Sequence, residues 1–174
     1  FRVIPDDASR VAALEKGEVH VAVKIPPSDL PRLKANSKIR IMTSPSARTI
    51  YKGFNCLKEP FADKRIRQAL NYAVNKEAIV QNDLDGAGRV SDAPISPVIS
   101  GYVPIKAYAY SIEKAKALLT EAGFPEGFET TLHSPSGRYY KDGSLATAVA
   151  AGLLKVGGKA EIKLMEWANY IPFI

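Results

Sequence analysis

The most regular segment of this chain is residues 60–76, which read PFADKRIRQALNYAVNK. Asp63 can cap a helix, because its carboxylate can accept a hydrogen bond from a free backbone N–H of the first turn. Apolar residues then recur at helical spacing and form one face: Ile66, Ala69, Leu70, Ala73 and Val74. We therefore expect an amphipathic helix with this face buried, and a continuation over residues 76–83 capped by Asn75.

Upstream of this segment, signals for short helices alternate with signals for strands. One helix is expected after Asp6, closed by Gly17, and a second starts at Pro26. Alternating apolar and polar residues predict three strands, at residues 19–23, 39–43 and 48–54.

Downstream, the pattern of helices and strands continues after a long loop. Residues 86–110 contain several Pro, Gly and Ser without sustained periodicity, so we expect an ordered loop, and loops of this length are usually functional. Helices are expected from Ser111 to Gly123 and, capped by Asp142, up to Val156. Strands are expected at residues 128–133 and 160–165. The alternation predicts an α/β fold with a mixed sheet flanked by helices.

The composition indicates a folded protein, and the motifs of several enzyme classes are missing from the sequence. Hydrophobic residues make up 46% and charged residues 24%, the balance of a folded globular protein. We find no nucleophile beside a base, no phosphate-binding glycine loop and no cluster of metal ligands. His20 and His133 stand alone, and the single Cys56 has no base near it in sequence. We therefore expect no catalytic residue, no metal site and no cofactor.

Positive charge is concentrated in one part of the chain. The net charge is +6, and residues 31–67 hold ten Lys or Arg against Glu59 and Asp63. A solvated face of helices and strands is the simpler interpretation. The alternative function is a basic nucleic-acid-binding module that uses this stripe, with an affinity that falls steeply with salt.

Four blocks of sequence occur in a characteristic order and spacing. They are residues 9–19, residues 51–76, residues 111–127, and the pair 154–157 and 166–170. Together they resemble the peptide/nickel class of extracytoplasmic solute-binding proteins of ABC importers. The resemblance covers essentially the whole chain, and four blocks in order are far more specific than any one.

The resemblance implies a two-lobed protein of the class II periplasmic-binding type, about three times as long, which closes on its ligand like a hinged clamp. Residues 1–44 would be the end of the first lobe and a hinge crossing, and residues 45–174 most of the second lobe, truncated at its C-terminal end. Residues 1–6 lack the features of a signal peptide, so we expect the signal sequence to lie outside this chain.

The resemblance also implies a ligand, partners and a location. The ligand would be an oligopeptide or dipeptide, although nickel complexes, opines, heme and glutathione occur in the same family. The partners would be the membrane permease subunits of the importer, with the binding protein itself a monomer. It would be periplasmic or a cell-surface lipoprotein.

Several aromatic residues at strand ends and in loops could line a ligand cleft. They are Tyr51, Phe54, Tyr102, Tyr108, Tyr110, Tyr139, Tyr140, Trp167 and Tyr170. The resemblance matches Trp167 to a pocket-lining Trp and Tyr51 to a pocket-proximal aromatic. With Asn55 and Tyr102 they are the predicted ligand-binding residues. We expect Trp167 to be partly exposed at the cleft mouth; a role in the core is the alternative.

Overall fold

The computed structural model describes residues 1–174 and forms two compact units, Phe1–Pro45 and Ser46–Ile174. The sequence predicted a boundary between residues 44 and 45. The assignment of the units to two lobes stays a prediction. Each unit is described separately.

The first unit contains three short helices. They are α1 (Asp7–Glu15), the 3-10 helix η1 (Pro27–Asp29) and α2 (Leu30–Lys34). The carboxylate of Asp6 accepts a hydrogen bond of 2.8 Å from the backbone N–H of Ser9 and so caps α1. Val11 and Ala13 of α1 and Leu33 of α2 are buried. Both predicted helices of this unit are confirmed.

Three predicted strands are absent, at residues 19–23, 39–43 and 48–54. A strand requires a neighbouring strand that accepts and donates its backbone hydrogen bonds, and these segments pair with nothing in the chain. Alternating polarity identifies an extended segment but does not supply its partner. Val21 and Met42 accordingly remain 81% exposed.

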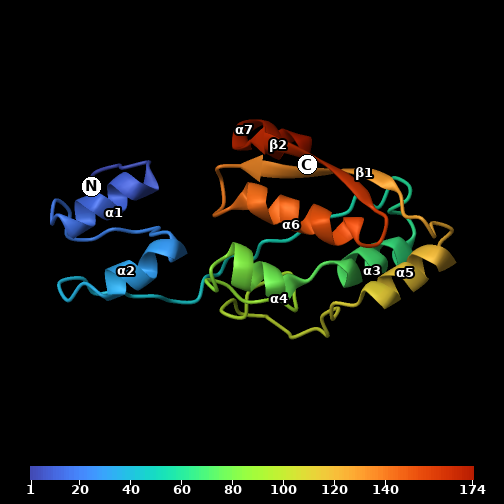
Figure 1. Ribbon diagram of the computed structural model, residues 1–174, viewed down its shortest axis with the longest axis horizontal. Helices are drawn as coiled ribbons and strands as arrows, with labels where there is room; N and C mark the ends of the chain where they lie inside the picture. The colour runs from blue at the N-terminus through green and yellow to red at the C-terminus, as the bar shows by residue number, and fades with distance from the viewer. The chain divides into compact units, whose positions relative to one another are not determined.

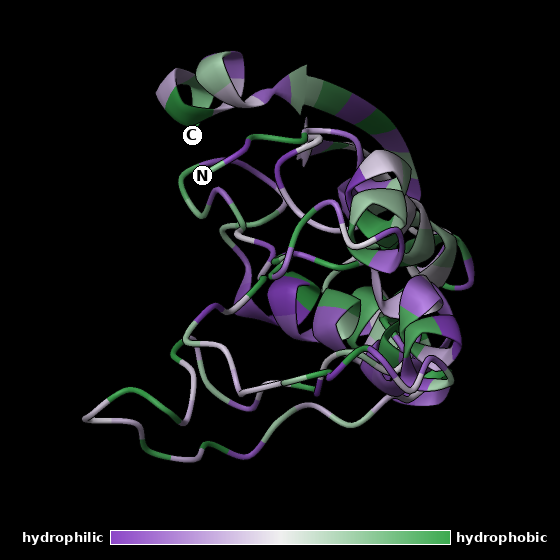
Figure 2. Cartoon of the chain, turned by 90° about the vertical axis from the view of Figure 1, so that its left-hand side faces the viewer, coloured by the Kyte–Doolittle hydropathy of each residue, from purple (hydrophilic) through white to green (hydrophobic).

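The second unit contains the sheet. Strands β1 (Glu129–Ser136) and β2 (Lys159–Glu166) are parallel, with register from Glu129 opposite Lys159 to Ser136 opposite Glu166. Helix α6 (Asp142–Leu154) connects them and packs against both strands (Figure 1). The α/β class and the strands predicted at 128–133 and 160–165 are therefore confirmed, in a sheet of two strands. Figure 2 shows hydrophilic and hydrophobic residues alternating along the strand that leads into the C-terminal helix.

The core lies beside this sheet. Helices α3 (Lys64–Ala73) and α5 (Ile112–Glu121) pack together, and α6 contacts α3. The buried apolar residues of this cluster are Ile66, Ala69, Leu70, Ala73, Ala115, Leu119, Leu153 and Val156. Asp63 caps α3 and Ser111 caps α5, as the sequence predicted. Removing apolar surface from water stabilises the fold by about 25 cal/mol per Å². Burial of its apolar face therefore supplies most of the stability of α3.

Two glycine turns bring the starts of the strands together. Gly127 and Gly157 have φ of +79° and +82°, in the left-handed region that favours glycine. A Cβ on Gly127 would lie 2.2 Å from the carbonyl carbon of Gly157. No residue with a side chain fits here without moving the backbone.

The remaining helices are short. Helix α4 (Lys76–Ala78), capped by Asn75, continues as the π-helix η2 (Ile79–Asp83), and α7 (Trp167–Phe173) follows β2. Residues 86–110 form neither helix nor strand, as predicted. None of the helices combines the length and apolarity needed to cross a membrane.

One predicted cap is wrong. Asp142 is the first residue of α6, and Lys141, with φ of +52°, occupies the cap position without a side-chain hydrogen bond. The carboxylate of Asp142 instead accepts hydrogen bonds from the preceding loop, at Arg138 and Tyr139.

Candidate functional site

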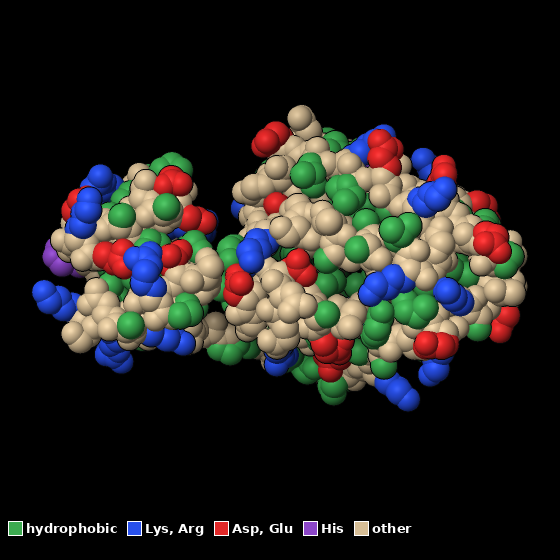
Figure 3. Space-filling view, in the orientation of Figure 1, with side chains coloured by type: hydrophobic (Ala, Val, Ile, Leu, Met, Phe, Trp, Pro, Cys, Tyr) green, Lys and Arg blue, Asp and Glu red, His purple; other side chains and the backbone are tan.

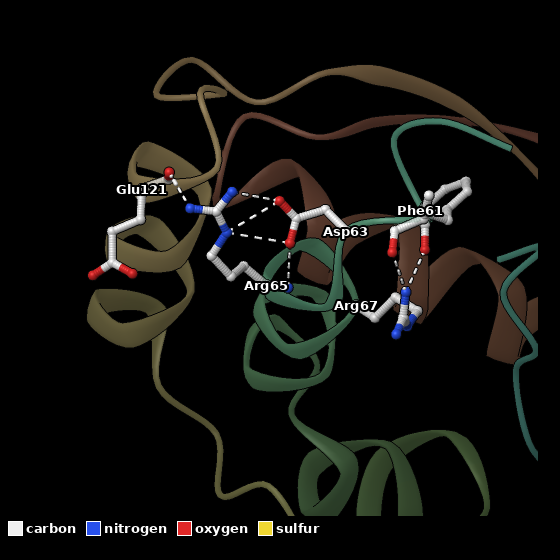
Figure 4. Close-up of polar contacts among 6 residues, drawn as sticks. Phe61, Asp63, Arg65, Arg67 and Glu121 are labelled. Atoms are coloured by element: carbon white, nitrogen blue, oxygen red, sulfur yellow. Dashed lines mark hydrogen bonds and ion pairs between the residues drawn. The ribbon is translucent and has the colours of Figure 1, made fainter.

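Two arginines of the signature segment, residues 60–76, bind groups just before α3 and at the end of α5 (Figure 4). Arg65 forms an ion pair of 2.6 Å with Asp63 and donates a 2.6 Å hydrogen bond to the carbonyl of Glu121 at the end of α5. Arg67 donates to the carbonyls of Phe61 and Ala62, at 2.6 and 2.8 Å. Hydrogen bonds from Arg65 lower the pKa of Asp63. These guanidinium groups fix the start of α3 and join it to the end of α5. The signature segment therefore has a structural role.

A different arrangement occurs at the other end of the sheet. In open α/β sheets, ligand crevices form outside the carboxyl ends of the strands. Tyr139 follows β1 and Trp167 follows β2. Trp167 stacks on Tyr170 with 5.9 Å between ring centroids and meets Tyr139 edge-on at 5.8 Å. Helix α7 contacts both strands beside this end (Figure 1). Within this contact, the ring of Phe173 packs on that of His133 in β1, with 4.3 Å between the ring centroids.

Two arginines cover these rings. The guanidinium of Arg138 lies 4.8 Å from the centre of the Trp167 ring, and that of Arg48 lies 5.4 Å from the centre of Tyr139. Cation–π contacts of this kind fix the plane of a guanidinium while its N–H groups stay free to donate. Both side chains belong to exposed residues and neither forms an ion pair or a side-chain hydrogen bond within the chain. We call these five residues the strand-end cluster: Arg48, Arg138, Tyr139, Trp167 and Tyr170.

The cluster can bind a flat or anionic group. Free guanidinium donors match a carboxylate or a peptide carbonyl, and the indole and phenol faces offer apolar contact. Tyr170 is half-buried, and burial raises the pKa of its hydroxyl, with smaller contributions from Tyr139 and Tyr51. The phenol is therefore neutral near pH 7 and can donate a hydrogen bond.

Segment 48–54 runs beside β1 in the opposite direction. Arg48 meets Tyr139 just after the strand, and the ammonium of Lys52 lies 3.4 Å from the hydroxyl of Ser134 within it. Burial lowers the pKa of Lys52. This path brings Tyr51, which is 74% exposed, to the cluster end of the sheet.

The structure brings together only some of the predicted site residues. Trp167 is half-buried, and Tyr51 lies close enough to Tyr170 to affect its pKa. Asn55 lies at the opposite end of β1, where its carboxamide accepts a hydrogen bond of 3.1 Å from the N–H of Leu57. Its neighbour Phe54 joins a chain of rings that leads through Phe61 to Phe128, just before β1.

Tyr102 belongs to the long loop 86–110. Its hydroxyl donates a 2.7 Å hydrogen bond to Asp92, and this bond raises the pKa of Tyr102. The buried Ser96 of the same loop donates to the carbonyl of Ser46 at 2.8 Å. These bonds order the loop, and no contact joins Tyr102 to the strand-end cluster. A ligand contact at Tyr102 or Asn55 stays a prediction.

The sequence reasoning missed Arg48 and Arg138. The sequence pattern places Arg48 in the basic stripe and predicts no role for Arg138. The signal that could have found Arg138 is its place between Gly137 and two tyrosines, in the turn that follows the strand predicted at residues 128–133.

Three arginines of the basic stripe are bound within the chain. Arg32 pairs with Glu15 and Asp29, while Arg65 and Arg67 bind carboxylate and carbonyl oxygens as described. Charged side chains of both signs are scattered over the visible face in Figure 3. The nucleic-acid alternative has no support in these contacts.

An open groove lies away from the cluster. It has a volume of about 650 Å³ and lies between α6 and the first halves of the two strands, with Thr131, Ala151 and Leu154 in its lining. No group of three or more His, Cys, Asp or Glu is placed to hold a metal ion.

Comparison with known proteins assigns the chain to a family. Residues 1–172 match the sequence profile of the bacterial extracellular solute-binding proteins, family 5 Middle. The chain belongs to this family. Its fold class and its resemblance to peptide-importer binding proteins are thereby confirmed.

Three family 5 proteins illustrate the similarity. The dipeptide-binding protein of Escherichia coli K12 is 38% identical over 98% of this chain and 33% of the relative. Heme-binding protein A of Haemophilus influenzae is 36% identical over 97% of this chain and 31% of the relative. The ABC transporter-associated periplasmic binding protein DppA of Helicobacter pylori, in complex with the peptide STSA, has a TM-score of 0.81 and 29% identity, over 98% of this chain and 33% of that protein. The chain therefore spans about a third of the length of these family 5 proteins, all of which are binding proteins.

Proposed function

We propose that this chain is part of the substrate-binding component of an ABC importer, and that its strand-end cluster contacts a short peptide. The observation that carries the proposal is the pair of guanidinium groups, of Arg48 and Arg138, stacked on aromatic rings with no acceptor in the chain. The family membership and the peptide ligands named for two of the relatives support the same ligand class.

The chemistry required is binding and release. Arg138 would donate to the C-terminal carboxylate or a carbonyl of the peptide, and Trp167 would cover its apolar side chains. Such contacts need no nucleophile and no cofactor, so the protein acts as a carrier and catalyses nothing. Tyr51 lies at the same end of the sheet and would extend the apolar surface.

The wider arrangement follows from the same proposal. Residues 1–44 would close a first lobe and cross the hinge, residues 45–174 would form most of a second lobe, and the ligand would be held between the lobes as they close. The protein would work as a monomer outside the cytoplasm, in the periplasm or as a surface lipoprotein. It would deliver its ligand to the permease subunits.

Titration of the full-length protein with matched peptides tests the ligand contact. We expect a dipeptide with a free carboxylate to bind more tightly than its C-terminal amide, by about 10- to 100-fold, because a hydrogen bond to a charged group contributes about 1.5–3 kcal/mol. Arg138→Ala should remove most of this difference.

A control variant removes the same charge from the other end of the sheet. Lys58→Ala should leave the preference for the free carboxylate intact, since Lys58 is exposed and makes no side-chain contact with the cluster. Equal loss in both variants, or no loss in Arg138→Ala, would contradict a carboxylate contact at Arg138.

A further inference from the structure

Arg138 and Tyr139 lie in a five-residue loop, Gly137–Lys141, between β1 and α6. One side of this loop is fixed by Asp142, whose carboxylate accepts hydrogen bonds from the N–H groups of Arg138 and Tyr139, at 3.0 and 3.2 Å. These two bonds hold the backbone of the loop. They leave the rest of it, Tyr140 and Lys141, to be fixed by other contacts.

The second anchor comes from a distant part of the chain. One carboxylate oxygen of Asp85 accepts a hydrogen bond from the hydroxyl of Tyr140 and another from the ammonium of Lys141, both at 2.9 Å. The ammonium also lies 5.4 Å from the centre of the Tyr140 ring. The side chains of Lys141 and Asp85 are 34% and 33% exposed, so this anchor is at the surface and outside the core.

Both ends of the anchor have an unusual backbone. Asp85 and Lys141 each have φ of +52°, a conformation that residues other than glycine adopt at an energetic cost. Asp85 comes just after the π-helical turn η2, and such turns often occur near functional sites. Backbone strain of this kind persists only where the surrounding contacts enforce it.

An exposed ion pair contributes little to global stability, so stability does not account for a strained, three-residue anchor at this place. We propose that Asp85 is a positioning residue for the ligand site. By holding Tyr140 and Lys141, it sets the loop conformation that keeps Arg138 and Tyr139 against Trp167. This inference rests on the proposed function of the strand-end cluster.

The direct test follows the indole of Trp167 in the full-length protein. The protein is labelled with fluorotryptophan, and the fluorine NMR signal of Trp167 is assigned with Trp167→Phe. We expect Asp85→Ala to shift or broaden this signal, because the guanidinium above the ring loses its fixed place. Asp83→Ala, which removes the same charge two residues earlier, should leave the signal unchanged. An unchanged signal in Asp85→Ala would overturn the proposal.

Peptide affinity supplies a second readout, with the tetrapeptide STSA and dialanine as probes. Asp85→Ala should weaken binding about 3- to 30-fold, the range for residues that act through others, with a melting temperature within about 2 °C of the wild type. The exchanged pair Asp85→Lys with Lys141→Asp should recover part of the affinity. Equal affinity in Asp85→Ala and wild type would overturn the proposal.

The two readouts separate this inference from the function on which it rests. If the wild-type protein binds neither probe, the peptide ligand is wrong, and the fluorine signal of Trp167 still decides the role of Asp85. If the wild type binds and the signal does not respond to Asp85→Ala, the positioning role is wrong and the proposed function stands.

Discussion

The two ends of the small sheet use arginine in opposite ways. At the amino end, Arg65 and Arg67 are bound by a carboxylate and by backbone carbonyls, so their donors are used within the protein. At the carboxyl end, Arg48 and Arg138 lie on aromatic rings with no acceptor from the chain. The first pair fixes helices, and the second leaves donors free for a ligand. The segment with the clearest family signature therefore uses its arginines within the fold, and the guanidinium donors that we propose for ligand binding lie at the other end.

The largest expected effect lies at the amino end, in the core face of α3. Leu70→Asp places an unpaired carboxylate at a position that is only 4% exposed, and we expect a loss of about 3–5 kcal/mol in the free energy of unfolding. Lys64→Asp, at the exposed start of the same helix, should change stability by less than about 0.5 kcal/mol. Denaturant unfolding measures both. Similar stability of the two variants would mean that α3 does not carry the core.

The next largest loss of stability is expected at the turns of Gly127 and Gly157, at the amino end of the sheet. Gly127→Ala combines a left-handed backbone with a contact of 2.2 Å to Gly157, and we expect it to cost more than about 2 kcal/mol. Gly53→Ala is the matched control, because its new methyl group would meet nothing within 4 Å. If thermal unfolding shows the two variants to be equally stable, the strands do not start at this close contact.

The smallest effect concerns affinity at the carboxyl end. Trp167→Ala should weaken peptide binding to the full-length protein by about 1–3 kcal/mol, as hot-spot truncations do, and should change the melting temperature little because the indole is half-buried. Leu57→Ala, which removes an exposed apolar side chain at the amino end, should change neither quantity. A collapse of stability with unchanged affinity would identify Trp167 as a core residue.

The helices could be predicted from the sequence because their determinants are local. Caps at Asp63, Asn75 and Ser111 and apolar residues at helical spacing specify a helix without reference to the rest of the chain. A strand depends on a partner strand for its backbone hydrogen bonds. Strand β1 (residues 129–136) pairs with β2 (residues 159–166), whereas no strand pairs with the other three predicted segments, at residues 19–23, 39–43 and 48–54. The same alternating pattern therefore gave correct and incorrect strands.

The site could be predicted only in part, for a related reason. The position of Trp167 after a predicted strand and the family resemblance of Trp167 and Tyr51 single out these two residues, and their contact with a ligand stays a prediction. The cation–π contact of Arg48 is with Tyr139, 91 residues further along the chain, and that of Arg138 is with Trp167, 29 residues further along. No local pattern encodes such pairings. The anchor of Asp85 on Tyr140 and Lys141 is equally non-local.

The most direct test measures affinity and stability together in two arginine variants of the full-length protein. We expect Arg138→Ala to weaken binding of the dipeptide probe about tenfold or more with an unchanged melting temperature. Arg65→Ala should lower the melting temperature by a few degrees and leave the affinity unchanged. The account would be contradicted if Arg65→Ala lost affinity without losing stability, or if Arg138→Ala bound the probe as tightly as the wild type.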